Sequence, residues 1–278
     1  MNRTAVPHEL KTVGVVGAGR MGTPIIGHLV RKGFATRACD VNVARANAVK
    51  GLGAQWVASP ESLAGECDAI LVCVGFDREV QELLAESGPL RRAKPGAIVA
   101  ILSTVHPKTV QKLAKECESA GLHVVDSTVC RGGEAADQGT LLSFVGGSAE
   151  LVERLTPVLR AYSADVVHTG GVGTAQVAKA VNNLILWACL VADHEGLALA
   201  RHYGADIEAL RRALLISSCA NGPLEKWGSQ TMAWAEDDMA IVAEMAAAAG
   251  IALPQAAVNR EVCRALKPRR YKLELYGR

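Results

Sequence analysis

The sequence predicts a two-domain α/β protein, with a doubly wound parallel sheet in the first domain and an all-α second domain. Through the first half, short β-rich runs alternate with helical stretches, which is typical of βαβ units. A glycine-rich turn directly follows the first of these runs. After Gly170 and Gly171 the β-like runs stop, and the chain becomes rich in Ala and Leu at helical spacing. We therefore expect domains over residues 1–168 and 169–278.

The expected strands are short apolar or β-branched runs. They lie at Thr12–Val16, Ala35–Cys39, Gln55–Ala58, Ala69–Val74, Ala97–Leu102, His123–Val125, Leu141–Val145 and Asp165–His168. The helices expected between them lie at Met21–Lys32, Asn42–Lys50, Pro107–Ala120 and Leu151–Tyr162. Because Ala69–Val74 and Ala97–Leu102 are apolar throughout, we expect them to be covered on both faces, as strands of parallel sheets are.

The second half reads as helices only. They are expected at Thr174–His202, Ile207–Leu215, Asp238–Ala249 and Pro254–Leu266. The first is long for a globular protein, and we expect it to join the domains. Its alanine-rich surface suits close packing against another subunit.

Composition excludes several classes of function. The 278 residues carry a formal net charge of +2 and only 4% aromatic residues, which argues against a nucleic-acid partner. The eight cysteines form no C-x-x-C pair, and most lie in apolar runs. They indicate buried thiols in a reducing compartment, with no disulfide framework and no metal site.

No apolar signal core is visible at the N-terminus. The apolar stretches are interrupted within about a dozen residues, short of the roughly 20 needed to span a bilayer. We therefore expect a cytoplasmic protein with no membrane partner.

The strongest local signal is the turn Gly17-Ala-Gly-Arg-Met-Gly22, because it follows a buried strand and opens a helix. In such a turn Gly17 permits the tight bend, Gly19 lets a pyrophosphate approach the backbone, and Gly22 lets helix and strand pack closely. The free N–H groups of the helix then face the phosphates. We expect the whole turn, including Arg20 and Met21, to bind a dinucleotide.

Further cofactor contacts are expected where other strands end, since doubly wound sheets bind ligands at that edge. Asp40 ends the second strand, where a carboxylate accepts hydrogen bonds from the ribose and repels a 2′-phosphate. NAD is therefore expected and NADP is less favoured. Val74 and Gly75 follow the fourth strand, and Ser103 and Thr104 follow the fifth. The alternative for Ser103 and Thr104 is capping of the helix at Pro107.

Two later segments suggest chemistry. A glycine-rich loop after Asp126 offers backbone N–H groups to an anion. Further on, Lys179, Asn182 and Asn183 stand at i, i+3 and i+4 and share one helix face. A lysine on a mostly apolar helix is costly to bury, and the two amides beside it could bind a hydroxyl and a carboxylate. The alternative is a solvated lysine with two polar neighbours.

In this order, the motifs resemble those of the β-hydroxyacid dehydrogenases, which include 3-hydroxyisobutyrate dehydrogenase and tartronate semialdehyde reductase. The resemblance runs from Val13 to about Pro254. The matching segments are Gly17–Gly22, Ser103-Thr104 with Pro107, Asp126 through Gly139–Leu141 to Val145–Gly147, Gly173 through Lys179 to Asn183, and Asp238 through Gly250 to Pro254.

The resemblance implies a Rossmann domain followed by an all-α domain, assembled as dimers or tetramers through the long helix. It implies that Lys179 is the general acid/base and that Asn182 and Asn183 bind substrate. It also implies that the loop of Cys130, Arg131 and Gly132 holds the carboxylate of a small 3-hydroxy acid or its semialdehyde.

The chain departs from the family pattern at several points. The family usually has Ser-Gly-Gly where this chain has Cys130–Gly132, and Ala-Pro in place of Ser127-Thr128. A usual lysine is replaced by Asp237, and the segment before it, from Ser218, looks shorter than in the family. Sulfolactaldehyde reductases also look to have arginine at position 131, which suggests a sulfonate or second anionic group on the substrate. The alternative is an Arg131 turned to solvent or to an acid such as Glu134.

Two other functions stay open. One is an imine reductase on the same fold, against which Lys179 and Asp40 both count, because the imine reductases usually carry Asp or Tyr at the lysine position and favour NADPH. The other is a non-catalytic NAD-binding regulatory protein, which would need no proton-transfer group.

Overall fold

The computed structural model describes residues 9–276 and divides into two compact units, of which the first ends at Lys179 and the second begins at Ala180. The N-terminal eight residues, on which the expectation of no signal core partly rests, lie outside the described part. The division falls inside one continuous helix, α8 (Thr174–His202). The unit boundary at Lys179 therefore lies eleven residues beyond the predicted boundary at residue 168 (179 − 168), and the helix itself joins the units.

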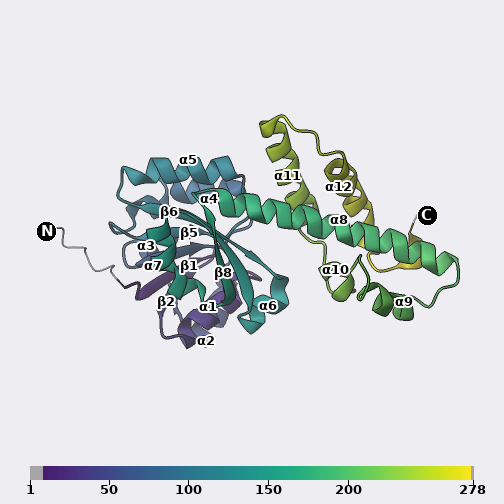
Figure 1. Ribbon diagram of the computed structural model, residues 1–278. Coiled ribbons are helices and arrows are strands. Elements are labelled where there is room, and N and C mark those ends of the chain that lie inside the picture. Colours follow the sequence, from purple (N-terminus) through teal and green to yellow (C-terminus); the bar gives the residue numbers. More distant parts are fainter. Residues whose placement is uncertain (1–8, 277–278) are drawn as a thin grey trace. The chain divides into compact units, whose positions relative to one another are not determined.

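The first unit contains one sheet with the strand order β3-β2-β1-β4-β5-β6-β7-β8 (Figure 1). The strands are β1 (Thr12–Val16), β2 (Ala35–Cys39), β3 (Gln55–Trp56), β4 (Ala69–Val72), β5 (Ile98–Ile101), β6 (His123–Cys130), β7 (Leu141–Gly146) and β8 (Ser163–Gly170). The strands from β1 to β6 are parallel to one another, which confirms the predicted doubly wound sheet. The parallel arrangement changes at one edge, where β7 runs antiparallel to β6 and β8 runs parallel to β7.

Helices cover both faces of this sheet (Figure 1). They are α1 (Gly22–Arg31), α2 (Ala46–Gly51), α3 (Pro60–Ala64), α4 (Asp77–Leu84), α5 (Pro107–Glu118), α6 (Gly132–Gln138) and α7 (Ala149–Leu159), with 3-10 turns η1 (Val43–Arg45) and η2 (Pro89–Arg92). Helices α1, α2, α6 and α7 pack on one face, and α3, α4 and α5 pack on the other. In β4, Ala69 and Leu71 enter the first core while Ile70 and Val72 enter the second. This alternation explains why the strand is apolar throughout.

The second unit is helical, as predicted. It contains the rest of α8 together with α9 (Ile207–Leu214), α10 (Gly222–Glu225), α11 (Ala235–Ala249) and α12 (Pro254–Leu266), followed by the 3-10 turns η3 (Lys267–Arg269) and η4 (Leu273–Leu275). Its core forms where Trp187 and Leu190 of α8 meet Met239 of α11 and Cys263 of α12.

Within residues 9–276, α8 is the one helix that is long and apolar enough to cross a membrane, with a mean hydropathy of 1.4 in its most apolar window. The sequence expectation differed because it treated polar residues such as Asn182 as breaks. A core helix passes the same test, and the packing of Trp187 and Leu190 against α11 and α12 is what a core helix shows.

Candidate functional site

The carboxyl ends of the parallel strands form one row across the sheet of the first unit. The strand register pairs Val16 with Cys39 and Val72, Val72 with Ile101, and Ile101 with Asp126. The predicted cofactor residues directly follow the members of this row in the sequence. They therefore lie along one edge of the sheet, on both sides of the point between β1 and β4 where the strand order reverses, which is where doubly wound folds bind ligands.

The three glycines of the turn before α1 have different reasons to be glycine. Gly17 has a φ of 99°, in the left-handed region, and a Cβ there would collide with the carbonyl oxygen of Cys73. A Cβ on Gly22 would collide with the carbonyl oxygen of Gly17. A Cβ on Gly19 would meet nothing within 4 Å, and no side chain caps α1. Because the protein itself does not require glycine at position 19, the open space there fits the close approach of a dinucleotide pyrophosphate.

Asp40 is held firmly at the end of β2. Its carboxylate accepts hydrogen bonds from the backbone N–H of Ala18 at 2.7 Å and of Asn42 at 2.8 Å. Arg45 lies against it, with Nε 3.6 Å from the carboxylate and Nη1 donating to the Ala18 carbonyl at 2.9 Å. Each carboxylate oxygen keeps a lone pair for a ribose hydroxyl. The geometry therefore fits a ribose, with a cation beside it that partly offsets the carboxylate charge.

Ser103 and Val74 contact each other across the row. The Ser103 hydroxyl donates to the Val74 carbonyl at 2.8 Å and accepts from the Val74 N–H at 3.0 Å. The neighbouring Gly75 N–H donates to Glu79 at 2.9 Å. These hydrogen bonds fix the backbone at this edge of the sheet. The N-cap of helix α5 is His106, so the alternative that Ser103 or Thr104 caps this helix is excluded. Within residues 9–276 the half-buried Thr104 hydroxyl has no hydrogen-bond partner, which leaves it for a ligand.

Gln176 of α8 was missed by the sequence analysis. Its side chain is 1% exposed, and its amide accepts from the Val105 N–H at 2.9 Å and donates to the Ser103 carbonyl at 2.9 Å. Both polar groups of the amide are used, so Gln176 fixes the backbone on either side of Thr104. A glutamine in a mostly apolar helix was the available signal.

Asp126 and Thr128 of β6 fix the start of α8. The Asp126 carboxylate accepts from the N–H groups of Gly173 at 2.7 Å and Gln176 at 3.0 Å, and the Thr128 hydroxyl donates to the Ala175 carbonyl at 3.0 Å. Burial raises the pKa of Asp126, and the two N–H donors oppose that shift. Asp126 is thus an N-cap formed across the fold, and it determines the position of the first turns of α8.

Lys179 lies against the end of β6. Its ammonium donates to the Val129 carbonyl at 2.9 Å and contacts the Cys130 sulfur at 3.9 Å. Because a lysine ammonium has three N–H donors, one remains for a ligand. The structure therefore brings Lys179 to the loop that begins at Cys130, although the two are 49 residues apart in the chain.

Arg131 adopts the left-handed conformation, with a φ of 85°. Its guanidinium forms an ion pair with Asp165 at 2.6 Å and donates to the Thr140 carbonyl at 3.1 Å. A left-handed backbone suits glycine, which explains why glycine is expected at this position in the family. The guanidinium is bound to Asp165 and not to Glu134, the neighbour suggested by the sequence, and Gly132 continues the loop with a φ of 79°.

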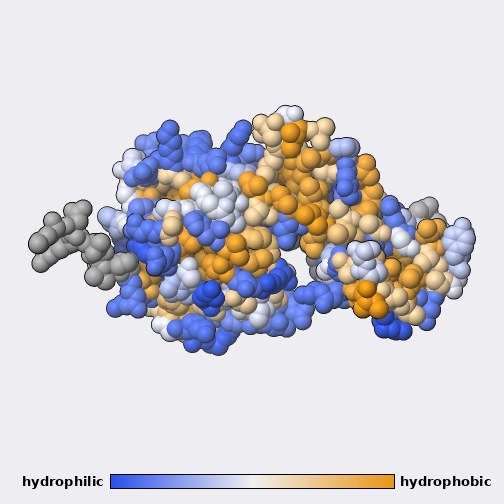
Figure 2. All heavy atoms as spheres, viewed as in Figure 1, coloured by the Kyte–Doolittle hydropathy of each residue, from blue (hydrophilic) through white to orange (hydrophobic). Residues whose placement is uncertain are grey.

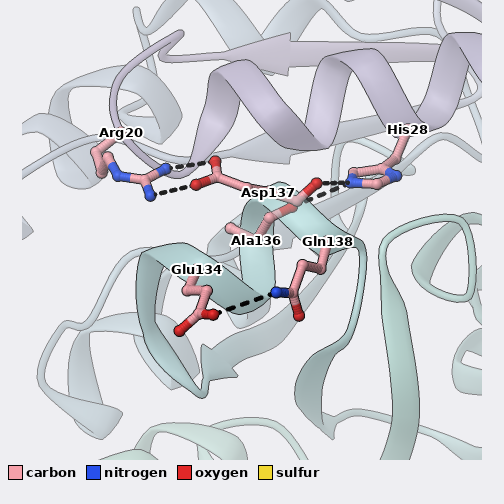
Figure 3. Close-up of polar contacts among 6 residues, drawn as sticks. All are labelled: Arg20, His28, Glu134, Ala136, Asp137 and Gln138. Atoms are coloured by element: carbon pink, nitrogen blue, oxygen red, sulfur yellow. Dashed lines mark hydrogen bonds and ion pairs between the residues drawn. The ribbon is translucent and has the colours of Figure 1, made fainter. Parts of the chain in front are cut away.

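Helix α6 follows directly where the sequence predicted a continuous glycine-rich loop. The segment Glu134–Gln138 consists mostly of good helix formers, and the helix ends at Gly139, which has a φ of 71°. Asp137 of this helix forms a bidentate pair with Arg20 of the glycine turn (Figure 3). Met21, the next residue of the turn, is partly buried against the core.

Asn182 and Asn183 belong to the second unit. The Asn182 side-chain amide donates to the side-chain oxygen Oδ1 of Asn183 at 3.0 Å, and Asn183 is 3% exposed. On α11, Asp238 accepts from the Trp187 indole N–H at 2.9 Å, while Asp237 is exposed in the first turn. Because a negative charge is favourable at a helix N-terminus, the position of Asp237 in the first turn of α11 gives a structural reason for an acidic residue where the family usually has lysine. Residues 9–276 contain no cluster of three or more His, Cys, Asp or Glu suited to a metal.

Two family descriptions match adjoining parts of the chain. Residues 12–171 match the NAD binding domain of 6-phosphogluconate dehydrogenase. Residues 173–273 match the NAD-binding segment of NADP-dependent 3-hydroxyisobutyrate dehydrogenase. Together they cover nearly all described residues.

Among similar proteins, the NAD-dependent L-serine dehydrogenase of Pseudomonas aeruginosa is 29% identical over 78% of this chain and 73% of its own. The 3-sulfolactaldehyde reductase of Escherichia coli is 26% identical over 91% and 89%. The fold is similar to that of a Mycobacterium tuberculosis 3-hydroxyisobutyrate dehydrogenase solved with L-serine, with a TM-score of 0.86, 22% identity and coverage of 94% and 95%. An imine reductase of Myxococcus stipitatus is more distant, with a TM-score of 0.69, 19% identity and 93% coverage of each chain.

Proposed function

Because the chain belongs to the 3-hydroxyisobutyrate dehydrogenase family, and is therefore an NAD(P)-dependent hydroxyacid dehydrogenase, we propose that it transfers hydride between NAD and a small 3-hydroxy acid or its semialdehyde, with Lys179 as general acid/base. The observation that carries this proposal is the position of the Lys179 ammonium, 2.9 Å from the Val129 carbonyl. It lies at the end of β6, on the sheet that also carries the glycine turn.

The nicotinamide of the cofactor supplies the hydride acceptor in oxidation and the hydride donor in reduction. In oxidation, the neutral amine of Lys179 takes the hydroxyl proton of the substrate through its lone pair, while one N–H stays on the Val129 carbonyl. In reduction, the ammonium donates that proton to the forming alkoxide. Gln176, Asp126 and Thr128 position the helix that carries Lys179 and do not take part in proton transfer.

For the cofactor, Gly17–Gly22 would hold the pyrophosphate and Asp40 the adenosine ribose. Val74, Gly75, Ser103 and Thr104 would lie along its further course, with the Thr104 hydroxyl as the available donor. Because Asp40 carries a negative charge where a 2′-phosphate would lie, NAD is the expected cofactor in preference to NADP.

For the substrate, the loop of Cys130, Arg131 and Gly132 would bind the anionic group, and Asn182 and Asn183 would add amide contacts. The relatives are named for L-serine and 3-sulfolactaldehyde, and a small anionic compound of this kind is the substrate class we propose. A sulfonate or second carboxylate would compete with Asp165 for the Arg131 guanidinium, because arginine binds such groups bidentately.

Neither alternative function is favoured. Imine reductase structures are 19% identical or less to this chain and share its fold. Lys179, held with a free donor beside the anion loop, has a role in a hydroxyacid dehydrogenase and none in a non-catalytic sensor.

We further propose a cytoplasmic homodimer or homotetramer. The support is a stripe of exposed apolar side chains on α8, at Val177, Val181 and Ile185, with exposed fractions of 42%, 49% and 58%. Figure 2 shows orange, hydrophobic residues gathered on the helices of the second unit. Light scattering of the wild type and of a Val181→Asp variant tests this, and equal masses at the size of one chain would contradict it.

The function is tested by incubating the purified protein with NAD and a panel of small 3-hydroxy acids, sulfonated ones included, at mildly alkaline pH. We expect NADH to form with at least one member of the panel. The matching semialdehyde should consume NADH in the reverse direction. NADH binding without turnover of any hydroxy acid or semialdehyde would contradict the proposal, and turnover of cyclic imines in their place would favour the imine reductase.

A further inference from the structure

Arg20 of the glycine turn and Asp137 of α6 form an ion pair that no role in catalysis or cofactor binding accounts for. Two parallel hydrogen bonds join the groups, Nη1 to Oδ1 at 2.7 Å and Nη2 to Oδ2 at 2.6 Å (Figure 3). The pair lowers the pKa of Asp137 and raises that of Arg20. Both side chains are more than half exposed, and water screens such pairs so well that they add little to stability.

The pair joins two segments 117 residues apart, of which one belongs to the proposed cofactor site and the other to the proposed substrate site. Arg20 lies in the turn whose backbone faces the cofactor pyrophosphate. Asp137 lies in α6, which starts at Gly132, the last residue of the loop Cys130–Gly132, and Cys130 of that loop contacts Lys179. The backbone of α6 also comes close to Arg20, because a Cβ on Gly133 would lie 2.5 Å from the guanidinium.

The helix that follows the glycine turn, α1, also contacts α6 close to Asp137. His28 of α1 contacts the carbonyl oxygens of Ala136 at 3.0 Å and Asp137 at 3.1 Å through Nε2 (Figure 3). Its Nδ1 lies 2.8 Å from Arg31, which has only donors, so Nδ1 accepts and Nε2 carries the hydrogen. His28 and Arg20 thus both hold the C-terminal end of α6, and Arg20 alone of the two also lies close to Gly133, near the start of the helix.

We propose that the Arg20–Asp137 pair couples cofactor binding to the ordering of the substrate loop, with Asp137 as a positioning residue. An arginine has five N–H donors and stays charged, so Arg20 can keep Asp137 on one edge and donate to a pyrophosphate oxygen with the others. A bound dinucleotide then holds Arg20 in place, Arg20 holds Asp137, and α6 keeps the loop Cys130–Gly132 against Lys179. This inference rests on the proposed function, because it requires a dinucleotide in the glycine turn.

The test is hydrogen–deuterium exchange of the full chain with and without NADH, which needs no identified substrate. In the wild type, NADH should slow amide exchange in peptides covering residues 131–139 by about tenfold, within the usual range of coupling between sites. In Asp137→Asn, NADH should still bind but slow that segment less than about twofold. Glu134→Gln is the matched control, since it removes one negative charge from α6 but only a contact with Gln138 inside the same helix. It should behave as the wild type.

Arg20→Lys provides a second variant, because lysine keeps the charge but loses the bidentate geometry. It should also lose the protection of residues 131–139. Full NADH-induced protection in Asp137→Asn or Arg20→Lys would overturn the coupling while leaving the proposed function intact. A wild type that binds no NADH would overturn the proposed function, and this inference with it.

Discussion

The contacts of Asp40 lead to a quantitative prediction about the cofactor. Two unit charges about 4 Å apart interact by about 4 kcal/mol at an effective dielectric constant near 20. A 2′-phosphate beside Asp40 would meet a repulsion of this order, and Arg45 at 3.6 Å from the carboxylate offsets part of it. The Arg45 side chain is 42% exposed and that of Asp40 is 11% exposed, so water screens the arginine more. We expect NAD to bind at least about tenfold tighter than NADP, or about 1.4 kcal/mol.

Two substitutions separate the contributions of the two charges. Asp40→Asn removes the repulsion, so the ratio of NAD to NADP affinity should fall by about tenfold. The asparagine also loses one of the two backbone N–H contacts of the carboxylate, which changes the affinity for both cofactors. The ratio of NAD to NADP affinity is therefore the quantity to compare. Arg45→Gln should weaken NADP and leave NAD nearly unchanged, which raises the ratio. Calorimetric titration of both cofactors measures all three proteins, and an unchanged ratio in Asp40→Asn would refute the placement of Asp40 beside the ribose.

Three further predictions follow from individual contacts. Arg131→Gly should raise KM about tenfold for doubly anionic hydroxy compounds and little for singly charged ones. The expected effect is limited to about tenfold because the Arg131 guanidinium already pairs with Asp165 and shares its charge with that carboxylate. An unchanged substrate ranking would mean that Arg131 serves only the pair with Asp165. Burial lowers the pKa of His194 below its unfolded value near 6.5, so the folded protein should lose stability as the pH falls from about 6.5 towards 5. This group should contribute no more than about 1.4 kcal/mol per pH unit to the loss. Denaturant titrations should show a flatter pH dependence of the unfolding free energy in His194→Gln, and equal slopes in the two proteins would contradict the assignment. Gln176→Leu leaves two buried backbone groups without partners and should destabilise the protein by about 1–3 kcal/mol while weakening NAD binding; a variant as stable as the wild type would exclude the role given to this amide.

The parallel part of the sheet was predictable because its residues carry a local signal. Ala69–Val74 and Ala97–Leu102 are apolar runs bounded by glycine or polar residues, and strands covered on both faces need this pattern. Strand β6 was predicted to end at Val125 but continues to Cys130. Its polar residues Asp126 and Thr128 interrupt the apolar run, and they are buried because they bind the start of α8.

The direction of β7 and several short helices could not be predicted. Apolar alternation is the same in parallel and antiparallel strands, so Leu141–Val145 gave no sign of its reversal. Helix α4 was missed because it starts after Phe76, with Glu79 supplying the cap in place of the usual Ser, Thr, Asp or Asn at the first position. Helices α3 and α10 are only five and four residues long.

The residue types of the candidate site were visible in the sequence, but their partners were not. The turn Gly17–Gly22 stood out because its glycines lie between a buried strand and a helix, and the role of Lys179 was indicated by the family resemblance in addition to its spacing from the two asparagines. The contacts that position them join residues far apart in the chain, such as Gln176 with Val105 or Arg20 with Asp137. Such pairs leave no mark on local periodicity and follow only from the folded sheet.

The central claim is that Lys179 transfers the proton during hydride transfer, and the turnover of Lys179→Met tests it most directly. With the most active compound of the hydroxy acid panel, steady-state formation of NADH should fall by about 10²–10⁴-fold, the range typical of a general acid/base. The affinity for NADH should stay within about twofold of the wild type, because the nearest contacts of Lys179 are Val129 and Cys130 and not the glycine turn. Turnover close to that of the wild type, with NADH binding retained, would contradict the assignment.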